Sequence, residues 1–426
     1  MKRVGMFVWN HFTNDARVMR EGTSLSQNGY DVELICIDDP NDPNIEQYEE
    51  INDHFRVYRM KRYPSLLLFM QRAYRFAFGK KWPLIPIALI WAYLVYLIPW
   101  IVLPLTLIAV LMLKTKVRVL WIRGALILRM MWKGHKGNYD IYHSNDLNTM
   151  PQGYVSAKWR FNKKPLIYDS HEVQTSRTGY DSPWYEKFEK FFINRMDSMM
   201  VENATRAKYN EDLYGFYPNV LHNYPTEEIS IEKDTVDLHD ILDLPKEEKI
   251  LLYQGGIQMG RGLENIVEAF PQFKEGTLVF IGDGKIKDKL QKMVKEKNLE
   301  DKIKFIPKVP LKELPKYTRN GYLGFQVLNN VCFNHFSASS NKLFEYMMAE
   351  VPIVACDFPE IKKVVEENQI GVTIDPHIPD EIAKGVNYLL DNPDKREEFS
   401  KNCIPARKQY NWEKEQINLL EVYRQF

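Results

Sequence analysis

The sequence predicts an α/β protein with two domains, each built around a parallel sheet, and a hydrophobic helical insertion in the first domain. Three observations lead to this prediction. Strand-like and helical patterns alternate along both halves of the chain, which is typical of parallel sheets covered by helices. A polar, acidic stretch after Pro225 separates the halves. Thirty residues from Leu84 to Leu113 contain no Asp, Glu, Lys or Arg and interrupt the alternation in the first half.

The first half contains one strand-helix-strand unit before the hydrophobic run. Strand-like residues span Val4 to Trp9 and Asp31 to Ile37, and a helical pattern from Asp15 to Asn28 connects them. Gly29 follows this helix, as glycine commonly does. Further strand-like segments are Asp140 to His143, Pro165 to Tyr168 and Ser198 to Glu202. We therefore expect a first domain over residues 1–222, with an insertion at about 66–135.

The second half repeats the alternation. Its strand-like segments are Lys249 to Tyr253, Thr277 to Ile281, Ile303 to Ile306, Tyr322 to Val327, Pro352 to Ala355 and Gly371 to Ile374. We expect a second parallel sheet in a domain over residues 223–409, and a last helix over 410–426 that returns to the first domain. Because ligands bind at the carboxyl ends of parallel strands, two such domains facing each other make a central cleft the expected active site.

Composition argues against some classes of function. The 426 residues carry a formal net charge of +1, so the chain as a whole has no electrostatic preference for nucleic acid. Its four cysteines lack the spacing of a metal site, and the N-terminus is a strand pattern rather than a signal peptide. These features predict a protein of the reducing cytoplasm.

The hydrophobic run from Leu84 to Leu113 is long enough to enter a bilayer. A complete crossing would separate the first strands from those they should pair with, so we expect the run to lie in one leaflet, broken into short pieces by its prolines. The prolines are Pro83, Pro86, Pro99 and Pro104, and the flanking basic residues are Arg72, Arg75, Lys80, Lys81, Lys114, Lys116, Arg118, Arg123 and Arg129. Basic residues at both ends predict contact with anionic lipid on the cytoplasmic side. The alternative is a buried pair of core helices.

A glycine-rich loop follows the first strand of the second half. Its sequence is Gly255-Gly256-Ile257-Gln258-Met259-Gly260-Arg261-Gly262, and a helical pattern comes directly after it. Glycines here let backbone N–H groups approach a phosphate at the positive end of a helix, and Arg261 adds a fixed charge. The loop of a nucleoside triphosphatase would need Lys in place of Arg261 and Ser or Thr in place of Gly262, which argues against that class. A plain tight turn is the other alternative.

Two further segments follow later strands. Gly282-Asp283-Gly284 ends the next strand at the same edge of the sheet, where its glycines let a flat ring or a phosphate approach; an ordinary turn is the alternative. The segment from Ser337 to Met347 predicts a helix capped by Ser339 or Ser340, whose N–H groups can hold a diphosphate. Glu345 lies one turn into this helix among apolar residues, so its carboxylate needs a partner.

These motifs resemble the retaining glycosyltransferases of glycosyltransferase family 4, which have the GT-B fold of two Rossmann-like domains. The resemblance covers nearly the whole chain, to Tyr410-Asn411-Trp412-Glu413, and is strongest from Gly255 to Ala355. In that family the helix carries two glutamates eight residues apart. The second, which binds the ribose, falls on Glu345, and the first, which binds the transferred sugar, falls on Ser337.

The resemblance also implies the remaining site residues. The Arg and Lys that members often place on the donor diphosphate fall on Gly256 and Arg261, so Lys342 is the candidate for the second positive charge. His171 follows a strand and is expected near the donor sugar, with Arg261 as the other catalytic residue; a purely structural His is the alternative. The expected donor-binding residues are Gly255, Gly256, Gly282, Asp283, Gly284, Lys308, Ser337, Ser340, Asn341, Lys342 and Glu345. On the acceptor side we expect Asn14, Asp15 and Asn145.

The resemblance and the hydrophobic run together predict the reaction. A nucleotide-sugar, UDP-sugar first and GDP-sugar second, would donate its sugar with retention to a polyprenyl-linked or glycolipid acceptor in the membrane, in the synthesis of cell-surface polysaccharide or glycan. No Asp-x-Asp pair occurs in the chain, so we expect no metal and no other cofactor. Two alternatives remain: a nucleotide-sugar epimerase of the same architecture, and a catalytically inactive membrane scaffold, which Ser337 and Gly256 suggest.

Overall fold

The computed structural model describes residues 1–13, 15–42, 44–79, 81–176, 182–227 and 234–426, with the backbone alone at 81–83. These residues form two compact units. The first unit comprises Met1–Asp169 and Phe192–Asp197, and the second comprises Ser170–Phe191 and Ser198–Phe426. The division differs from the boundary expected at residue 222, because two segments before that residue group with the C-terminal half of the chain.

The first unit is built on a mostly parallel sheet. Its strands lie in the order β3-β4-β2-β1-β5-β6, and β3 runs antiparallel to its neighbour β4. They are β1 (Lys2–Phe7), β2 (Tyr30–Ile37), β3 (Tyr48–Asn52), β4 (Phe55–Met60), β5 (Ile141–Asn145) and β6 (Leu166–Ser170). The helices are α1 (Ala16–Gln27), α2 (Ser65–Gly79), α3 (Lys81–Leu97), α4 (Pro99–Lys114), α5 (Val117–Gly137) and α6 (Met150–Lys158). The predicted strands and the first helix are thus confirmed, close to their expected bounds.

The sequence reasoning does not predict β3 and β4. Arg59 occupies an inward position of β4 and is only 5% exposed. Its guanidinium pairs with the Glu49 carboxylate at 2.6 Å and donates to the Glu46 carbonyl at 2.9 Å. A charged residue therefore stands where the alternation of a half-buried strand leads one to expect an apolar one.

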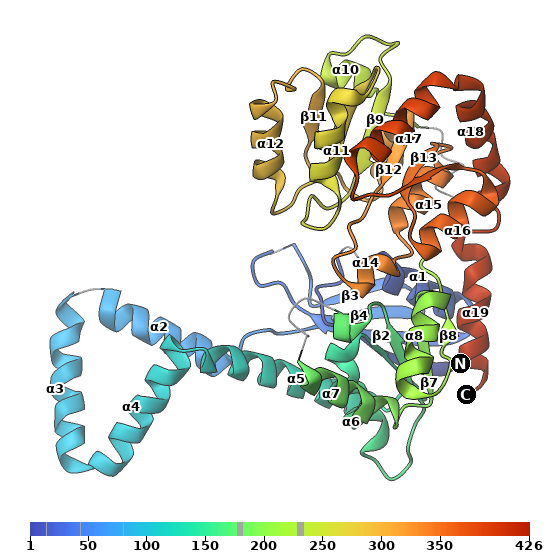
Figure 1. The fold of residues 1–426 in the computed structure, drawn as a ribbon. Coiled ribbons are helices and arrows are strands. Elements are labelled where there is room, and N and C mark those ends of the chain that lie inside the picture. The colour runs from blue at the N-terminus through green and yellow to red at the C-terminus, as the bar shows by residue number, and fades with distance from the viewer. Residues whose placement is uncertain (14, 43, 80, 177–181, 228–233) are drawn as a thin grey trace. The chain divides into compact units, whose positions relative to one another are not determined.

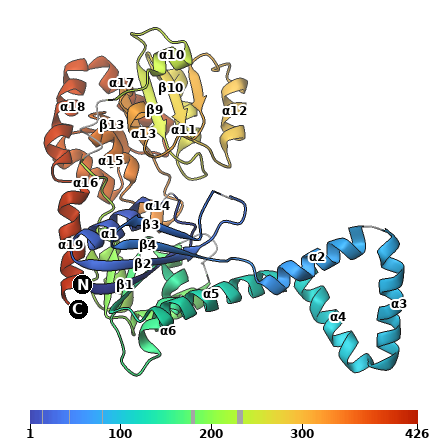
Figure 2. The ribbon, with the colours of Figure 1, turned by 180° about the vertical axis from the view of Figure 1, so that it is seen from behind.

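Helices α2 to α5 form the predicted insertion. Figures 1 and 2 show α2, α3 and α4 following one another as an arm, from which α5 returns to the strands of its unit. The prediction that prolines break the run into short pieces is wrong in part. Pro99 begins α4 after a break at Ile98, but Pro86 and Pro104 lie inside α3 and α4. The apolar run therefore forms two helices of 17 and 16 residues.

The arm exposes its apolar side chains. None of residues 84–113 is buried, which excludes the alternative of a core helical pair within this chain. No single helix of the described residues is long and apolar enough to cross a membrane. Helices α4 and α5 meet the length and composition of a span only as a pair, and they are bent by 84° at the break between them.

The second unit contains a six-stranded parallel sheet in the order β11-β10-β9-β12-β13-β14. Its strands are β9 (Ile250–Gln254), β10 (Thr277–Ile281), β11 (Ile303–Ile306), β12 (Leu323–Gln326), β13 (Ile353–Cys356) and β14 (Gly371–Ile374). Its helices include α10 (Leu238–Leu242), α11 (Leu263–Ala269), α12 (Lys287–Glu296), α13 (Leu314–Thr318), α14 (Phe333–Phe336), α15 (Asn341–Met348), α16 (Pro359–Asn368), α17 (Pro379–Asp391), α18 (Pro393–Arg407) and α19 (Trp412–Arg424). The α/β class is confirmed for both halves of the chain.

Both faces of this second sheet are covered. Leu251 and Tyr253 of β9 pack into one apolar core, whereas Ile250 and Leu252 pack into another. Successive side chains of a strand point to opposite faces, so the two cores lie on the two sides of the sheet. Burial on both sides explains why these strands are almost continuously apolar in the sequence.

The second unit also contains elements that precede residue 222. They are β7 (Ser198–Val201), α8 (Ala204–Tyr214), β8 (Asn219–Val220) and most of α7 (Pro183–Ile193). Helix α19 is tied to the segment after β8: the Trp412 N–H donates to the Pro225 carbonyl at 2.9 Å, and the His222 N–H donates to Glu415 at 2.8 Å. The expected return of this helix to the first domain stays a prediction.

Candidate functional site

The glycine-rich loop connects β9 to α11 and lies against the turn after β10. Gly255, Gly260 and Gly262 have positive φ angles of 119°, 79° and 68°, which residues with a Cβ rarely adopt. The Gly255 N–H donates to the Ile281 carbonyl at 2.9 Å, and the Ile257 N–H donates to the Asp283 carbonyl at 3.0 Å. The two loops expected from the sequence to share one sheet edge are therefore neighbours.

The glycines of the second loop serve this loop packing. A Cβ on Gly282 would lie 2.0 Å from the Gly255 carbonyl oxygen, and a Cβ on Gly284 would lie 2.1 Å from the Ile257 carbonyl oxygen. Asp283 accepts hydrogen bonds from Lys287 and, at 2.8 Å, from the Lys308 N–H. The hydrogen bond from Lys287 is the largest of the effects that hold the pKa of Asp283 below its usual range. The structural reading of these glycines, as a turn that packs closely, is therefore supported.

We expect Gly282→Ala to destabilise the second unit by about 1–3 kcal/mol, the usual cost of a strained backbone position. The new methyl group would overlap a backbone oxygen, and φ at this residue is 149°. Urea unfolding measures the change. Gly256→Ala is the matched control, because a Cβ there meets only the Gln258 side chain, at 3.4 Å. Equal stabilities of the two variants would contradict the packing role.

Lys342 and Arg261 bring two positive charges to the first loop. The Lys342 side chain is 7% exposed, and its Cδ would lie 3.5 Å from a Cβ on Gly255. Its Nζ is 4.3 Å from the centre of the Tyr253 ring. Burial, and then the charge of Arg261, lower the pKa of Lys342 to about 7, against the opposing effect of Glu345. Lys342 is buried and Arg261 is half-buried. Two cations placed in this way are suited to an anion that replaces lost water.

Glu345 has the partner that its apolar helix requires. Its Oε2 accepts a hydrogen bond from Gln254 Nε2 at 2.6 Å, and Thr318 Oγ1 donates to Gln254 Oε1 at 2.8 Å. The Thr318 hydroxyl thereby fixes the Gln254 amide so that its NH₂ group faces the carboxylate. Sequence reasoning missed Gln254 and Thr318, although a polar residue closing an apolar strand was a usable signal.

The start of α15 differs from the expected cap. Ser340 is the N-cap residue, but neither its hydroxyl nor that of Ser339 caps the helix, since no side-chain cap hydrogen bond is made. Asn341, the first helical residue, is exposed and accepts a hydrogen bond from Asn223 at 3.1 Å. The prediction of a serine cap is thus wrong in its hydrogen bond. The N–H groups of the first turn remain without a capping side chain, which suits an anion.

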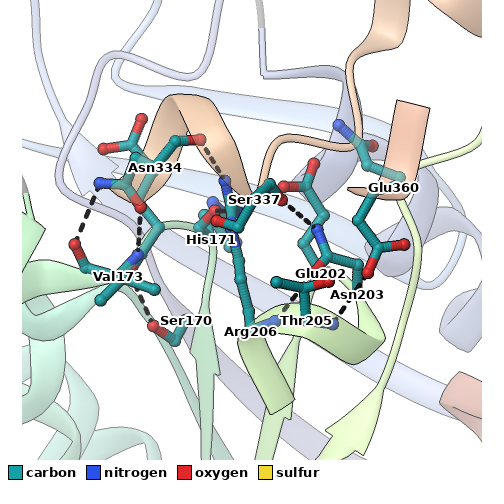
Figure 3. A network of polar contacts seen from close by, with 12 residues as sticks. Ser170, His171, Val173, Glu202, Asn203, Thr205, Arg206, Asn334, Ser337 and Glu360 are labelled. Atoms are coloured by element: carbon teal, nitrogen blue, oxygen red, sulfur yellow. Dashed lines mark hydrogen bonds and ion pairs between the residues drawn. The ribbon is translucent and has the colours of Figure 1, made fainter. Parts of the chain in front are cut away.

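Arg206 organises a polar network that includes Ser337 (Figure 3). Its guanidinium donates to the His171 carbonyl at 2.6 Å, to the Asn334 carbonyl at 3.3 Å and to Ser337 Oγ at 3.2 Å, and it also pairs with Glu202. The Asn203 side chain donates to the Ser337 carbonyl at 2.7 Å. Ser337 is fully buried in this network. The structure therefore gives Ser337 a partner in Arg206, and its place among the donor-binding residues stays a prediction.

The segment that carries His171 is held by hydrogen bonds with Arg206 and Asn334. The His171 carbonyl accepts from Arg206, while the Val173 N–H donates to Asn334 Oδ1 at 2.8 Å and the Val173 carbonyl accepts from Asn334 Nδ2 at 3.0 Å. The two bonds of Val173 attach the segment to α14, directly before α15, and the bond of His171 attaches it to α8. The catalytic role of the His171 side chain stays a prediction.

His335 is a further residue that sequence reasoning missed. It lies in α14, and one of its ring nitrogens is 3.1 Å from the Asn329 carbonyl. A Cβ on Gly260 would lie 2.7 Å from its ring, so the histidine packs on the glycine-rich loop. Burial is the first cause that lowers its pKa, and the charges of Arg261 and Lys342 act in the same direction.

The acceptor-side residues have structural partners in the first unit. Asp15 caps α1 by accepting from the Val18 N–H at 3.2 Å, and it also accepts from Asn10 at 2.7 Å. Asn145 is buried and donates to the Phe7 carbonyl at 3.0 Å. Asn14 lies outside the described residues. For Asp15 and Asn145, therefore, the described contacts are with the fold itself.

A buried cluster of charged residues also lies in the first unit. Ligand atoms of Glu21, His143 and Asp169 lie within 4.8 Å of one another. Arg17 donates to both oxygens of Asp169 at 2.7 and 2.8 Å, and its Nε lies 2.9 Å from Glu21. The guanidinium thus supplies the positive charge that the two carboxylates need, so the donor set fits an ion-pair cluster better than a divalent metal.

Comparison with known protein families identifies the C-terminal part of the chain. Residues 234–404 match the model of the glycosyl transferases group 1. This segment is similar to that family, and the match covers less than half of the chain. It contains the glycine-rich loop, Arg261, Lys342 and Glu345, and with them the whole set of expected donor-binding residues, whereas His171 lies outside it.

Curated relatives agree with the family match. A D-inositol 3-phosphate glycosyltransferase of Thermomonospora curvata is 24% identical over 326 residues, which cover 70% of this chain and 74% of the relative. The putative colanic acid biosynthesis glycosyl transferase WcaI of Escherichia coli is 32% identical over 142 residues, 32% of this chain and 34% of the relative. The family match and these relatives together support a glycosyltransferase.

Solved structures share the fold of the whole chain. Sucrose-phosphate synthase of Thermosynechococcus elongatus has a TM-score of 0.74 at 16% identity and covers 100% of this chain and 99% of its own. HepE of Anabaena, solved in complex with UDP-glucose, has a TM-score of 0.69 at 13% identity, with 100% of both chains covered. These similarities support the two-domain α/β fold expected of a GT-B glycosyltransferase.

Proposed function

We propose that this glycosyltransferase takes a sugar from a nucleotide-sugar, most simply a UDP-sugar, and transfers it with retention to a membrane-embedded acceptor. The acceptor is a polyprenyl-linked sugar or a glycolipid on the cytoplasmic side of the cell membrane, and the product enters cell-surface polysaccharide or glycan. A GDP-sugar is the second choice of donor. Family 4 membership, retention and independence of metal ions are parts of the same proposal.

The observation that carries the proposal is that two cations, Lys342 and Arg261, lie together at the glycine-rich loop. A nucleotide-sugar presents a diphosphate with two negative charges, and its bond to the sugar breaks with further charge on the leaving phosphate. Two cations, of which Lys342 is buried and Arg261 half-buried, stabilise that charge. The uncapped N–H groups at Ser340 and Asn341 add donors from the positive end of α15. Among the structural relatives, HepE has been solved with UDP-glucose, which agrees with this choice.

Lys342 can supply a positive charge that the family pattern has and this chain lacks at the corresponding position. The family's Arg position is occupied by Gly256, whose Cβ direction is open except for Gln258. Lys342 approaches the same loop from α15 and lies against Gly255. We infer that it replaces the missing cation, while Glu345, oriented by Gln254, accepts hydrogen bonds from the ribose.

The exposed arm supports a membrane-embedded acceptor. Its helices place large apolar side chains in water along both α3 and α4, including Trp91, Tyr96 and Trp100 at 43%, 83% and 73% exposure. An apolar surface of this extent needs a covering partner, and a lipid leaflet provides one. WcaI is named as a putative glycosyl transferase of colanic acid biosynthesis, which agrees with a biosynthetic role for this chain.

A catalytically inactive scaffold is the competing candidate, because Ser337 is buried and Gly256 carries no charge. Thermal unfolding of the purified chain with a panel of nucleotides and nucleotide-sugars separates the two. The transferase predicts a higher melting temperature with one nucleoside diphosphate series, because a ligand of the folded state stabilises it by mass action. Glu345→Ala should abolish the shift. No shift with any member of the panel, and no donor hydrolysis, would favour the scaffold.

Donor binding should depend on pH through Lys342. Its pKa of about 7 lies below the ordinary value of 10.5, so the unliganded side chain loses its proton as the pH rises through about 7. A bound diphosphate favours the protonated form, so binding takes up a proton above that pH. We expect the dissociation constant of a nucleotide-sugar to rise between pH 7 and pH 8.5, by about tenfold per unit at most. Titration calorimetry measures this dependence.

The variant Lys342→Met tests whether Lys342 causes the pH dependence of donor binding. It retains the apolar part of the side chain and removes the titrating group, so affinity should be lower and nearly independent of pH. A wild-type affinity that does not change over this range would show that the protonation of Lys342 does not control donor binding. A Lys342→Met variant with the wild-type slope would show that another group titrates.

A further inference from the structure

Helix α5 has an apolar stripe on each of two opposite sides. Leu126, Met130 and Gly134 are buried, and Gly134 lies so close to β1 that a Cβ there would be 2.5 Å from the Phe7 ring. On the opposite side Leu128 and Trp132 are 66% and 65% exposed. The inner stripe explains how α5 is held in the first unit. The outer stripe is unexplained, since the outer side of such a helix is normally polar.

The loop after α6 adds two exposed aromatic residues at the same end of α5. Trp159 is 68% exposed and Phe161 is fully exposed. Between them, Arg160 donates to the His135 carbonyl at 2.7 Å and to the Asn138 side chain. Arg160 thus fastens the loop to the last turn of α5, while Trp159 and Phe161 remain in water.

The surroundings of this surface are basic. From His54 to Tyr139 the chain has fifteen lysines and arginines and no aspartate or glutamate. Four of these cations and one from the loop have no ion pair with any residue that the structure describes: Arg118, Arg123, Lys116, Lys136 and Lys163. Lys136 instead lies 4.9 Å from the centre of the Trp132 ring. Tryptophan beside lysine is typical of protein surfaces at the lipid headgroups.

The bend before α5 determines how this surface would lie relative to a lipid leaflet. Helices α4 and α5 meet at 84° across two residues, Thr115 and Lys116. If α4 enters a leaflet steeply, α5 runs along the surface of that leaflet. Because α5 is 21 residues long, its outer side then lies along the headgroups and can contact them.

We propose that the outer side of α5 and the loop 159–163 form a second membrane-contact surface, separate from the apolar arm, which binds anionic lipid. Leu120 of α5, which is 70% exposed, enters the headgroup region together with Leu128, Trp132, Trp159 and Phe161. The unpaired cations bind lipid phosphates. The first unit then lies along the bilayer instead of being held by the arm alone. This inference rests on the proposed membrane association, but it assigns a different surface.

Vesicle flotation of the full chain tests the assignment. The variant Leu128→Ser, Trp132→Ser, Trp159→Ser and Phe161→Ser keeps the arm and changes only exposed side chains. We expect its binding to vesicles of phosphatidylcholine and phosphatidylglycerol to fall at least about tenfold, since several buried apolar groups are lost. Ile417→Ser with Tyr388→Ser is the matched control, because both residues are exposed in the second unit. Its binding should equal that of the wild type.

The outcomes separate this surface from the arm and from the proposed function. Binding of the fourfold variant at the wild-type level, or an equal loss in the control, would overturn the assignment. The stabilisation by nucleotide-sugar should be unchanged in the variant; if the wild type itself shows none, the proposed function fails and the vesicle result still stands. Should the variant unfold, Lys136→Glu with Lys163→Glu keeps every apolar residue. It should weaken binding to anionic vesicles alone, and unchanged binding would overturn the proposal.

Discussion

Replacing Arg261 with glutamine is expected to lower kcat/KM for the nucleotide-sugar by about 10²–10³-fold, the usual cost of removing one group that stabilises transition-state charge. Arg261 lies on the glycine-rich loop, and its charge already acts on Lys342 and His335. Glutamine keeps a polar side chain of moderate length and removes the charge. Initial rates of donor consumption with and without acceptor measure the effect.

The matched control for Arg261 is Lys285→Gln. Lys285 is an exposed cation that follows Gly284 on the neighbouring loop, so its loss tests whether a general reduction in positive charge suffices. We expect less than a threefold change, as exposed charges contribute little. If Arg261→Gln and Lys285→Gln lose the same activity, the diphosphate does not rest on Arg261.

Replacing Arg206 with methionine is expected to lower the free energy of unfolding of the second unit by about 3–5 kcal/mol, because a broken buried ion pair leaves its partner uncompensated. Glu202 would lose its counter-ion, and the carbonyls of His171 and Asn334 would each lose a donor. Urea unfolding monitored by tryptophan fluorescence measures the loss.

The neighbouring Lys208 provides the control for Arg206. It lies in the same helix, is 64% exposed and pairs only with other exposed side chains. Lys208→Met should change stability by less than about 0.5 kcal/mol. A loss below about 1 kcal/mol for Arg206→Met would show that the network of Figure 3 is solvated and contributes little.

Much of the fold follows from local patterns in the sequence. The strands Thr277–Ile281, Ile303–Ile306 and Gly371–Ile374 have the expected bounds. The first is buried at every position and reads as a short apolar run between turns. The other two are partly buried edge strands, which stand out as short runs rich in β-branched or aromatic residues. Helix α1 is bounded by a capping Asp15 and a terminal glycine, both visible in the sequence. The strands β3 and β4 were not accessible in this way, since the ion pair of Arg59 with Glu49 exists only after folding.

The site was predictable by segment, but its contacts were not. The glycine-rich loop, Lys342 and Glu345 are local features, and the structure brings them together at one end of β9. Gln254 reaches Glu345 across 91 residues of sequence, and Arg206 reaches Ser337 across 131. Such pairs depend on sheet order and helix packing, which no single segment encodes. For the same reason, the burial of Ser337 beside Arg206 does not follow from its position in the motif.

The most direct measurement is a calorimetric titration of the full chain with UDP and with UMP at pH 7. If the diphosphate rests between Arg261 and Lys342, UDP binds at one site at least about tenfold more tightly than UMP, equivalent to about 1.4 kcal/mol, and Lys342→Met reduces this difference. Should GDP show the larger thermal shift, the same comparison applies to GDP and GMP. Equal affinities for the diphosphate and the monophosphate, or no binding of either, would contradict a diphosphate site at this loop.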